Sequence, residues 1–210
     1  MHVIRSLCIA FSTYSRIPVP QVAWTDENRK YSMCFFPLIG VVIGLLLWGW
    51  LALCDALGFG ALLRGAVGAL LPVLVTGGIH MDGYLDTVDA LSSHQTREKK
   101  LAIMKDANCG AFAVIYGGVY LLAYAGFAYE VFAAGHILLI CPLFVLSRAL
   151  SGLCAVNLPN ARKSGMLCAF TSGVQRRTAT AALALAGLTA VATMAVSYTH
   201  LRAHETPEHL

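Results

Sequence analysis

The sequence predicts an all-α fold, a polytopic integral membrane bundle of helices, and three observations lead to that class. Of its 210 residues, 58% are hydrophobic and 12% are charged, about half the charged share of an ordinary soluble domain. Uncharged stretches long enough to cross a bilayer core of about 30 Å alternate with short charged ones. Basic residues gather on alternate connections. This pattern excludes a disordered chain, a coiled coil and an ordinary soluble globule, and no basic patch interleaved with aromatic residues points to nucleic acid.

The predicted elements follow in order along the chain. Residues 1–20 hold an apolar run too short to span, which ends in Ile17-Pro18-Val19-Pro20, so we expect a re-entrant or interfacial helix there. About five spans follow, near residues 33–57, 62–79, 107–128, 135–156 and 178–197. Gly40-x-x-x-Gly44 and Gly65-x-x-Gly68 lie inside the first two, and such spacings favour close approach of helices in lipid.

The orientation follows from lysine and arginine. Segments 1–32, 80–106 and 157–177 hold 12 of the 15 basic residues. With five spans these three segments lie on one side, and the positive-inside rule predicts that this side is the cytoplasm.

The last residues differ in composition from the rest. Residues 197–210 contain three of the seven histidines and two of the 11 acidic residues. We expect a non-native tail after a single membrane-embedded catalytic domain of residues 1–196, and a native chain that continued further.

One acidic block carries the most specific chemistry. Asp82, Asp86 and Asp89 follow Gly77-Gly-Ile-His80 with spacings of four and three, which on a helix place three carboxylates on one face. Like charges so close repel each other unless a cation lies between them, and Mg²⁺ takes one or two carboxylates together with substrate phosphates. The block therefore predicts a Mg²⁺–diphosphate site at a helix end. A solvated acidic loop is the plainer alternative, but the block adjoins an apolar span, where unpaired charge is costly.

Other polar residues are candidates for the same site. His80 is a candidate base, a substrate contact or an ordinary interfacial histidine. Lys105 and Asp106 precede the next span, where Lys105 would neutralise a phosphate and Asp106 would complete the metal shell; Gly110 would allow close backbone approach. Arg148 lies within a span, so it should pair with an acid or an anionic ligand, although a structural arginine bonded to a carbonyl is the alternative.

These residues together resemble a known family, the cobalamin synthases. Gly77-Gly-x-His80-x-Asp82-Gly-x-x-Asp86-x-x-Asp89 and Ile103-Met-Lys-Asp106-x-x-x-Gly110 are similar to that family's motifs, as are Phe11-Ser-Thr-Tyr-Ser-Arg16-Ile-Pro18-Val-Pro20, Phe36-Pro37-x-x-Gly40-x-x-x-Gly44, Ser147-Arg148 and Ala161-Arg162-x-x-Gly165-Met166. Two extra residues precede Arg16, and Ala90 stands where the family usually has glycine.

The resemblance implies an enzyme of the bacterial inner membrane with its active-site loops in the cytoplasm. It would join α-ribazole, or its 5′-phosphate, to adenosylcobinamide-GDP, releasing GMP. Mg²⁺ would be held by Asp82, Asp86 and Asp89; Asp106, His80 and Lys105 would serve catalysis; Arg16, Arg148, Arg162 and Gly110 would bind substrate. The lipid bilayer would surround the chain, and a homo-oligomer is compatible with the sequence.

Two other classes use similar residues. A CDP-alcohol phosphotransferase would show Asp-x-x-Asp-Gly-x-x-Ala-Arg with a second paired-aspartate motif, and a prenyltransferase would show two aspartate-rich motifs; the sequence has neither pattern. A cation transporter would use the carboxylates for a transported ion, but the sequence shows no internal repeat of the kind common in transporters.

Overall fold

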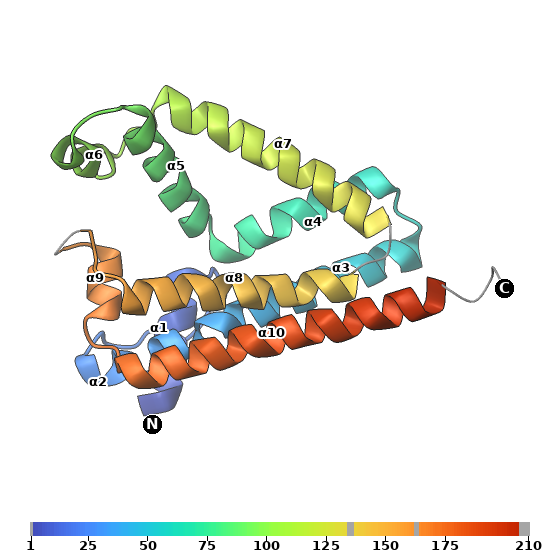
Figure 1. Ribbon diagram of the computed structural model, residues 1–210, viewed down its shortest axis with the longest axis horizontal. Coiled ribbons are helices and arrows are strands. Elements are labelled where there is room, and N and C mark those ends of the chain that lie inside the picture. Colours follow the sequence, from blue (N-terminus) through green and yellow to red (C-terminus); the bar gives the residue numbers. More distant parts are fainter. Residues whose placement is uncertain (1, 134–136, 162–163, 206–210) are drawn as a thin grey trace. The chain divides into compact units, whose positions relative to one another are not determined.

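The structure, a computed structural model, describes residues 2–133, 137–161 and 164–205, and within these ranges every regular element is a helix (Figure 1). Four helices are long and apolar enough to cross a membrane, or five if the bent pair α4 and α5 counts as one span. The all-α class and the predicted number of about five spans are therefore confirmed.

The chain divides into two compact units. Unit 1 comprises Met1–Gly49 and His136–Leu210, and unit 2 comprises Trp50–Gly135. The helices of unit 1 are α1 (His2–Tyr14), α2 (Asp26–Arg29), the short 3₁₀ helix η1 (Ser32–Phe35), the first part of α3 (Phe36–Leu57), α8 (Ile137–Asn157), α9 (Met166–Thr171) and α10 (Arg176–Glu205). Unit 2 contains the end of α3, α4 (Ala61–Thr76), α5 (Ile79–Ser92), α6 (Arg97–Ile103) and α7 (Ala111–Ala133).

In unit 1 the first predicted span, α3, buries one face. Ile39, Ile43 and Leu47 are fully buried at a spacing of four, whereas Leu38 and Leu45 are exposed. This is the pattern of a helix whose one stripe packs and whose other side meets lipid.

Two glycines let α3 approach α8 closely. A Cβ added to Gly40 would lie 2.5 Å from the carbonyl oxygen of Phe144, and one on Gly44 would lie 3.1 Å from Cβ of Cys141. The Cys141 thiol also lies 3.2 Å from the Gly44 carbonyl oxygen. The predicted packing role of Gly40-x-x-x-Gly44 is confirmed.

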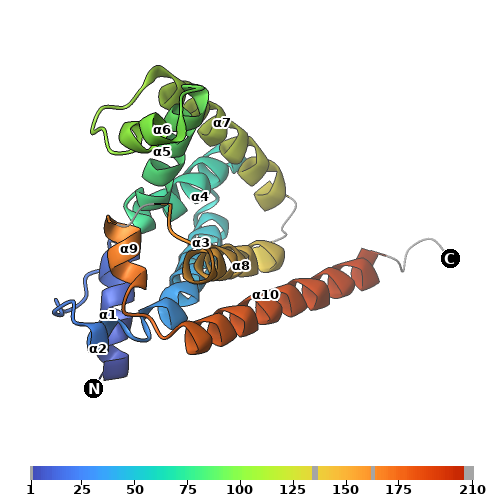
Figure 2. The same ribbon diagram turned by 60° about the vertical axis from the view of Figure 1, so that its left-hand side comes forward.

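Helices α8 and α10 run side by side in both ribbon views (Figures 1 and 2). Helix α1, with 13 residues, is shorter than the roughly 20 residues that a span needs. A short helix is thus confirmed at the N-terminus, and its re-entrant or interfacial position stays a prediction.

In unit 2 the chain turns sharply between α4 and α5. Their axes are bent by 91° at Gly77 and Gly78, whose φ angles are +64° and +79°, a left-handed conformation that glycine adopts without steric cost. The predicted span over residues 62–79 therefore ends at Thr76, and the aspartates start a new helix that leaves in another direction.

Helix α7 packs along α4, again through glycines. A Cβ on Gly65 would lie 2.9 Å from Cα of Tyr129, and one on Gly68 would lie 2.3 Å from the Phe132 ring. Gly65 and Gly68, the second predicted glycine pair, thus also allow two helices to pack closely.

Candidate functional site

The aspartate block forms a helix, as predicted. His80, Asp82, Asp86 and Asp89 all belong to α5. His80 and Asp82 are exposed, in the first turn, while Asp86 and Asp89 are half-buried. Asp82 and Asp86 are four residues apart on this helix and therefore share a face.

Asp89 has well-defined partners on α7. Its Oδ2 accepts a hydrogen bond from the backbone N–H of Gly110 at 2.6 Å, and its Oδ1 accepts one from Ala113 at 2.8 Å. The first N–H groups of a helix lack partners within the helix, so this carboxylate caps α7. The group that approaches Gly110 closely is the Asp89 side chain, and a contact of Gly110 with substrate stays a prediction.

The segment between α6 and α7 carries the second predicted cluster. Lys105 and Asp106 are both exposed. Oδ1 of Asp106 accepts hydrogen bonds from the backbone N–H of Asn108 at 3.0 Å and from its side-chain amide at 2.8 Å, which gives the segment a local turn. On α6, the pKa of Glu98 is lowered because its carboxylate accepts hydrogen bonds from its own backbone N–H and from Thr96.

The aspartate side chains of α5 are the predicted metal ligands. Among the described residues, no three His, Cys, Asp or Glu side chains are placed together so as to hold a metal ion. Asp82 and Asp86 still offer carboxylate oxygens on one face of α5, and two carboxylates are enough for Mg²⁺ that also binds substrate phosphates. By residue type and helical spacing these two carboxylates suit a Mg²⁺ ion that substrate phosphates also bind, and metal binding stays a prediction.

Two of the three predicted substrate-binding arginines belong to unit 1. Arg16 is exposed in the segment after α1, and Arg148 is half-buried in α8, with its guanidinium carbon 6.0 Å from the centre of the Phe144 ring. Arg162 lies outside the described residues.

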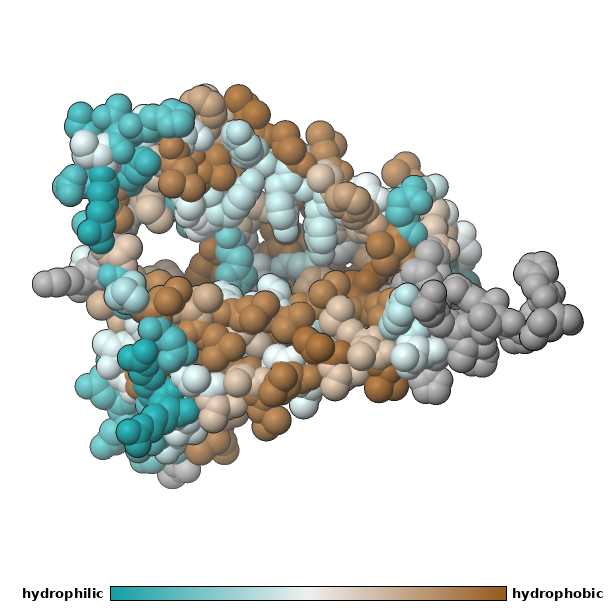
Figure 3. All heavy atoms as spheres, viewed as in Figure 1, coloured by the Kyte–Doolittle hydropathy of each residue, from teal (hydrophilic) through white to brown (hydrophobic). Residues whose placement is uncertain are grey.

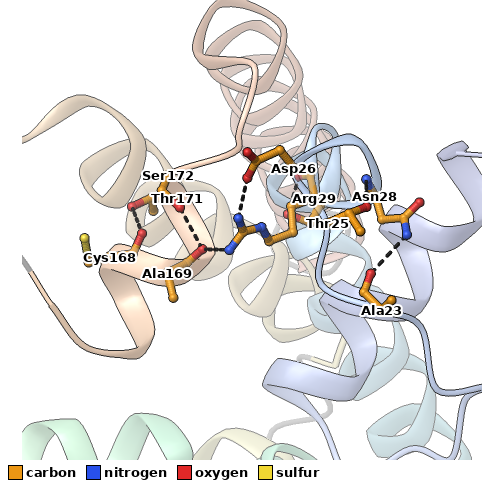
Figure 4. A network of polar contacts seen from close by, with 10 residues as sticks. Ala23, Thr25, Asp26, Asn28, Arg29, Cys168, Ala169, Thr171 and Ser172 are labelled. Atoms are coloured by element: carbon orange, nitrogen blue, oxygen red, sulfur yellow. Dashed lines mark hydrogen bonds and ion pairs between the residues drawn. The ribbon is translucent and has the colours of Figure 1, made fainter.

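Two of the three basic segments meet within unit 1 (Figure 4). Arg29 donates to the carbonyl oxygen of Ala169 and forms an ion pair with Asp26. The Gln175 N–H donates to the carbonyl oxygen of Lys30 at 2.9 Å. Segments 1–32 and 157–177 thus lie together, as the predicted topology requires.

Hydropathy is distributed unevenly over each unit (Figure 3). In unit 2 hydrophilic atoms gather over α6 and its neighbouring loops, and in unit 1 over α2 and the beginning of α10, while the length of α8 and α10 is largely hydrophobic. Such helices suit lipid along their length and water at their ends.

Known proteins resemble this chain along nearly all of its length. The model of one family, described as cobalamin-5-phosphate synthase, matches residues 6–204. The chain belongs to this cobalamin synthase family. The resemblance inferred from the aspartate block is thereby confirmed, and no solved structure is significantly similar.

Several curated relatives are named adenosylcobinamide-GDP ribazoletransferase. The protein from Lachnoclostridium phytofermentans is 42% identical over 182 residues, which are 87% of this chain and 69% of that protein. Those from Brevibacillus brevis and Desulfitobacterium hafniense are each 41% identical, over 56% and 57% of this chain and 47% of their own length. The chain thus spans about half the length of several relatives that it matches.

Sequence reasoning missed two sets of contacts. It gave Asp26 and Arg29 no structural role, although Thr25 before Asp26 and Glu27 is a recognisable helix start, and Thr25 does accept from the Asn28 N–H at 3.3 Å. It also missed the cap on α7. The available signal was Gly110 directly before an apolar helix, with three aspartates in α5, two helices earlier.

Proposed function

We propose that this chain, as part of the membrane enzyme, catalyses the reaction for which its relatives are named, the joining of α-ribazole or its 5′-phosphate to adenosylcobinamide-GDP. The observation that carries this proposal is the family match over residues 6–204. The α5 carboxylates and the neighbouring Lys105–Asp106 segment supply the residue types that a diphosphate substrate needs.

The reaction is a phosphoryl transfer. A ribazole hydroxyl attacks the phosphorus on the cobinamide side of the diphosphate, the bond to the bridging oxygen breaks, and GMP leaves with that oxygen. The hydroxyl proton passes to a base. Positioning and charge stabilisation supply most of the catalysis in such a transfer.

The α5 helix is the proposed cation site. Asp82 and Asp86 would hold Mg²⁺, and the sequence predicts Asp89 as a third ligand. When bound, Mg²⁺ supplies positive charge that offsets the charge of the diphosphate.

Each remaining side chain has a proposed role. Asp106 is exposed at a turn and is proposed as the base, with His80 as the alternative at the first turn of α5. Lys105, Arg16, Arg148 and Arg162 are proposed to bind the phosphates, because cationic side chains pair with phosphate oxygens.

The proposed location is the bacterial inner membrane, with the three basic segments in the cytoplasm. Exposed apolar side chains along α7, such as Val114, Leu122 and Phe127, suit contact with lipid tails. Single cysteines placed in segments 80–106 and 157–177, after removal of the seven native cysteines, should react with impermeant reagents from the same side. Labelling from opposite sides would overturn the proposed orientation.

The decisive experiment measures product formation. Membranes containing this chain within its full-length protein should convert adenosylcobinamide-GDP and α-ribazole to adenosylcobalamin with release of GMP. EDTA should abolish the conversion, and added Mg²⁺ should restore it. Membranes that bind the substrates but form no product, with or without Mg²⁺, would refute the proposed activity.

A further inference from the structure

The structure gives Asp89 a different environment from the other two aspartates of its block. Spacing alone places Asp82, Asp86 and Asp89 on one face of α5, but both oxygens of Asp89 accept hydrogen bonds from the start of α7, at 2.6 Å from Gly110 and 2.8 Å from Ala113. Charge-assisted bonds to backbone amides at a helix N-terminus are among the stronger polar contacts in a protein.

Gly110 makes this contact possible because it has no side chain. A Cβ at this position would lie 2.6 Å from Oδ2 of Asp89 and 2.7 Å from both its Cγ and Oδ1. Ala113, the second partner, is 1% exposed. The carboxylate therefore occupies a space that exists only with glycine at position 110.

The contact fixes the segment before α7. Residues 104–110 connect the end of α6 to the capped start of α7, and Lys105 and Asp106 lie in this segment. Through Asp89, the segment is held to the last turn of α5, one turn beyond Asp86. Release of the cap would leave Lys105 and Asp106 without this fixed position relative to α5.

We propose that Asp89 is a positioning residue and not a metal ligand: it caps α7 and thereby holds the Lys105–Asp106 segment against α5. The functional part of this proposal rests on the proposed function. Asp82 and Asp86 then remain as the two cation-binding residues. Mg²⁺ that also binds substrate phosphates commonly uses one or two carboxylates.

A double-mutant cycle on thermal unfolding in detergent tests the contact without any activity measurement. Gly110→Ala should lower the unfolding midpoint by roughly 4–8 °C, because its methyl group collides with the carboxylate. In an Asp89→Ala background, Gly110→Ala should lower the unfolding midpoint by less than about half as much, because the carboxylate that its methyl group would meet is absent. Gly118→Ala, on the same helix with no atom within 4 Å of the added Cβ, is the matched control. Additive effects of the two substitutions would overturn the contact.

Metal binding separates the positioning role from ligation. Mn²⁺ alone, followed by electron paramagnetic resonance, should bind Asp89→Asn with a Kd within about threefold of the parent protein, whereas Asp86→Asn should weaken binding by at least about tenfold. Equal losses in both variants would make Asp89 a ligand and overturn the proposal. Asn has the same volume as Asp and keeps one acceptor oxygen. Asp89→Asn can therefore replace Asp89→Ala in the thermal double-mutant cycle if Asp89→Ala does not fold.

Steady-state kinetics test the positioning itself. Asp89→Asn should reduce kcat by about 10–100-fold while the half-saturating Mg²⁺ concentration stays near that of the parent. If kcat per folded molecule is unchanged in Asp89→Asn, Asp89 only stabilises the start of α7, and the positioning role is overturned. If the parent protein has no ribazoletransferase activity, the proposed function fails, while the thermal cycle and Mn²⁺ binding still report on Asp89.

Discussion

Two helix pairs, α5 with α7 in unit 2 and α8 with α10 in unit 1, are held together by different kinds of contact. The first pair combines apolar contacts, such as Leu85 against Gly117, with a carboxylate that accepts hydrogen bonds from two backbone amides. The second packs along most of its length through small and apolar residues, with Gly152 of α8 against Leu183 of α10. Its hydrogen bonds lie at one end, where Asn157 of α8 accepts from Arg176 and Thr180 of α10. On α10 the fully or nearly buried positions recur at helical spacing: Ala179, Leu183, Gly187 and Ala190.

The difference lies in what each contact demands. A polar group within an apolar helical protein is costly unless it is fully bonded, so the carboxylate between α5 and α7 needs both of the amide bonds that it accepts. Small residues between α8 and α10 need only close contact, which stabilises helix association in lipid at no such cost. We therefore expect substitutions of the proposed cation-binding carboxylates in the first pair to reduce activity, and substitutions of the small residues in the second pair to change stability alone.

The largest effect is expected from the proposed cation site. Asp82→Asn and Asp86→Asn should each reduce turnover by at least about 100-fold, because each removes a negative charge from the Mg²⁺ site. The unfolding midpoint should hardly change, since the amide has the same size. GMP release measures the rate, and Glu98→Gln on exposed α6 is the control. Near-normal rates in both amides would leave the block without a catalytic role.

The next effect is on stability, in the packing of α8 against α3. Gly40→Ala would place a methyl group 2.5 Å from a backbone oxygen of Phe144, and backbone cannot rotate away. We expect a loss of about 3 kcal/mol in the free energy of unfolding, seen as a lower thermal midpoint. Gly49→Ala, on the same helix with nothing within 4 Å, should be tolerated. Equal effects of the two changes would contradict close contact at Gly40.

A smaller effect is expected at Arg148, which combines a scaffold position in α8 with a charge. If it binds a phosphate with its guanidinium fork, Arg148→Lys should raise the half-saturating concentration of adenosylcobinamide-GDP roughly tenfold, since lysine cannot form the paired hydrogen bonds. The matched control is Arg64→Lys, where the Arg64–Asp55 ion pair of 2.7 Å should accept lysine. Unchanged affinity in Arg148→Lys would assign this arginine a structural role.

Much of the fold followed from local sequence features. Hydropathy located the spans because each depends only on the composition of its own residues, and Gly40, Gly44, Gly65 and Gly68 all became packing positions. Membership of the family followed from the aspartate block, whose spacing is specific.

Features that depend on distant partners could not be predicted in the same way. Helical periodicity places Asp89 on the face of Asp82 and Asp86, but it cannot reveal that the start of α7, 21 residues later, supplies two amides to its carboxylate. The bond from Arg29 to Ala169 joins residues 140 apart. The predicted span over residues 62–79 passes through the adjacent glycines at 77 and 78, because the 91° bend there depends on the φ and ψ values of both.

The smallest expected effect is a gain in stability between α8 and α10. A Cβ on Gly187 would lie 3.5 Å from Cβ of Ala149 and 3.8 Å from Cδ1 of Leu146, which is ordinary van der Waals contact. Alanine is favoured over glycine within a helix by up to about 1 kcal/mol, so Gly187→Ala should raise the thermal midpoint by roughly 2–4 °C. On the facing helix, Gly152→Ala would bring a Cβ to 2.7 Å from Cδ2 of Leu183 and should lower the midpoint, although the leucine side chain can move. Both variants should keep the parent turnover per folded molecule, because the atoms that the added methyl groups would meet are all apolar. A midpoint lowered by Gly187→Ala as much as by Gly152→Ala would mean that α10 packs more tightly at Gly187 than these distances allow.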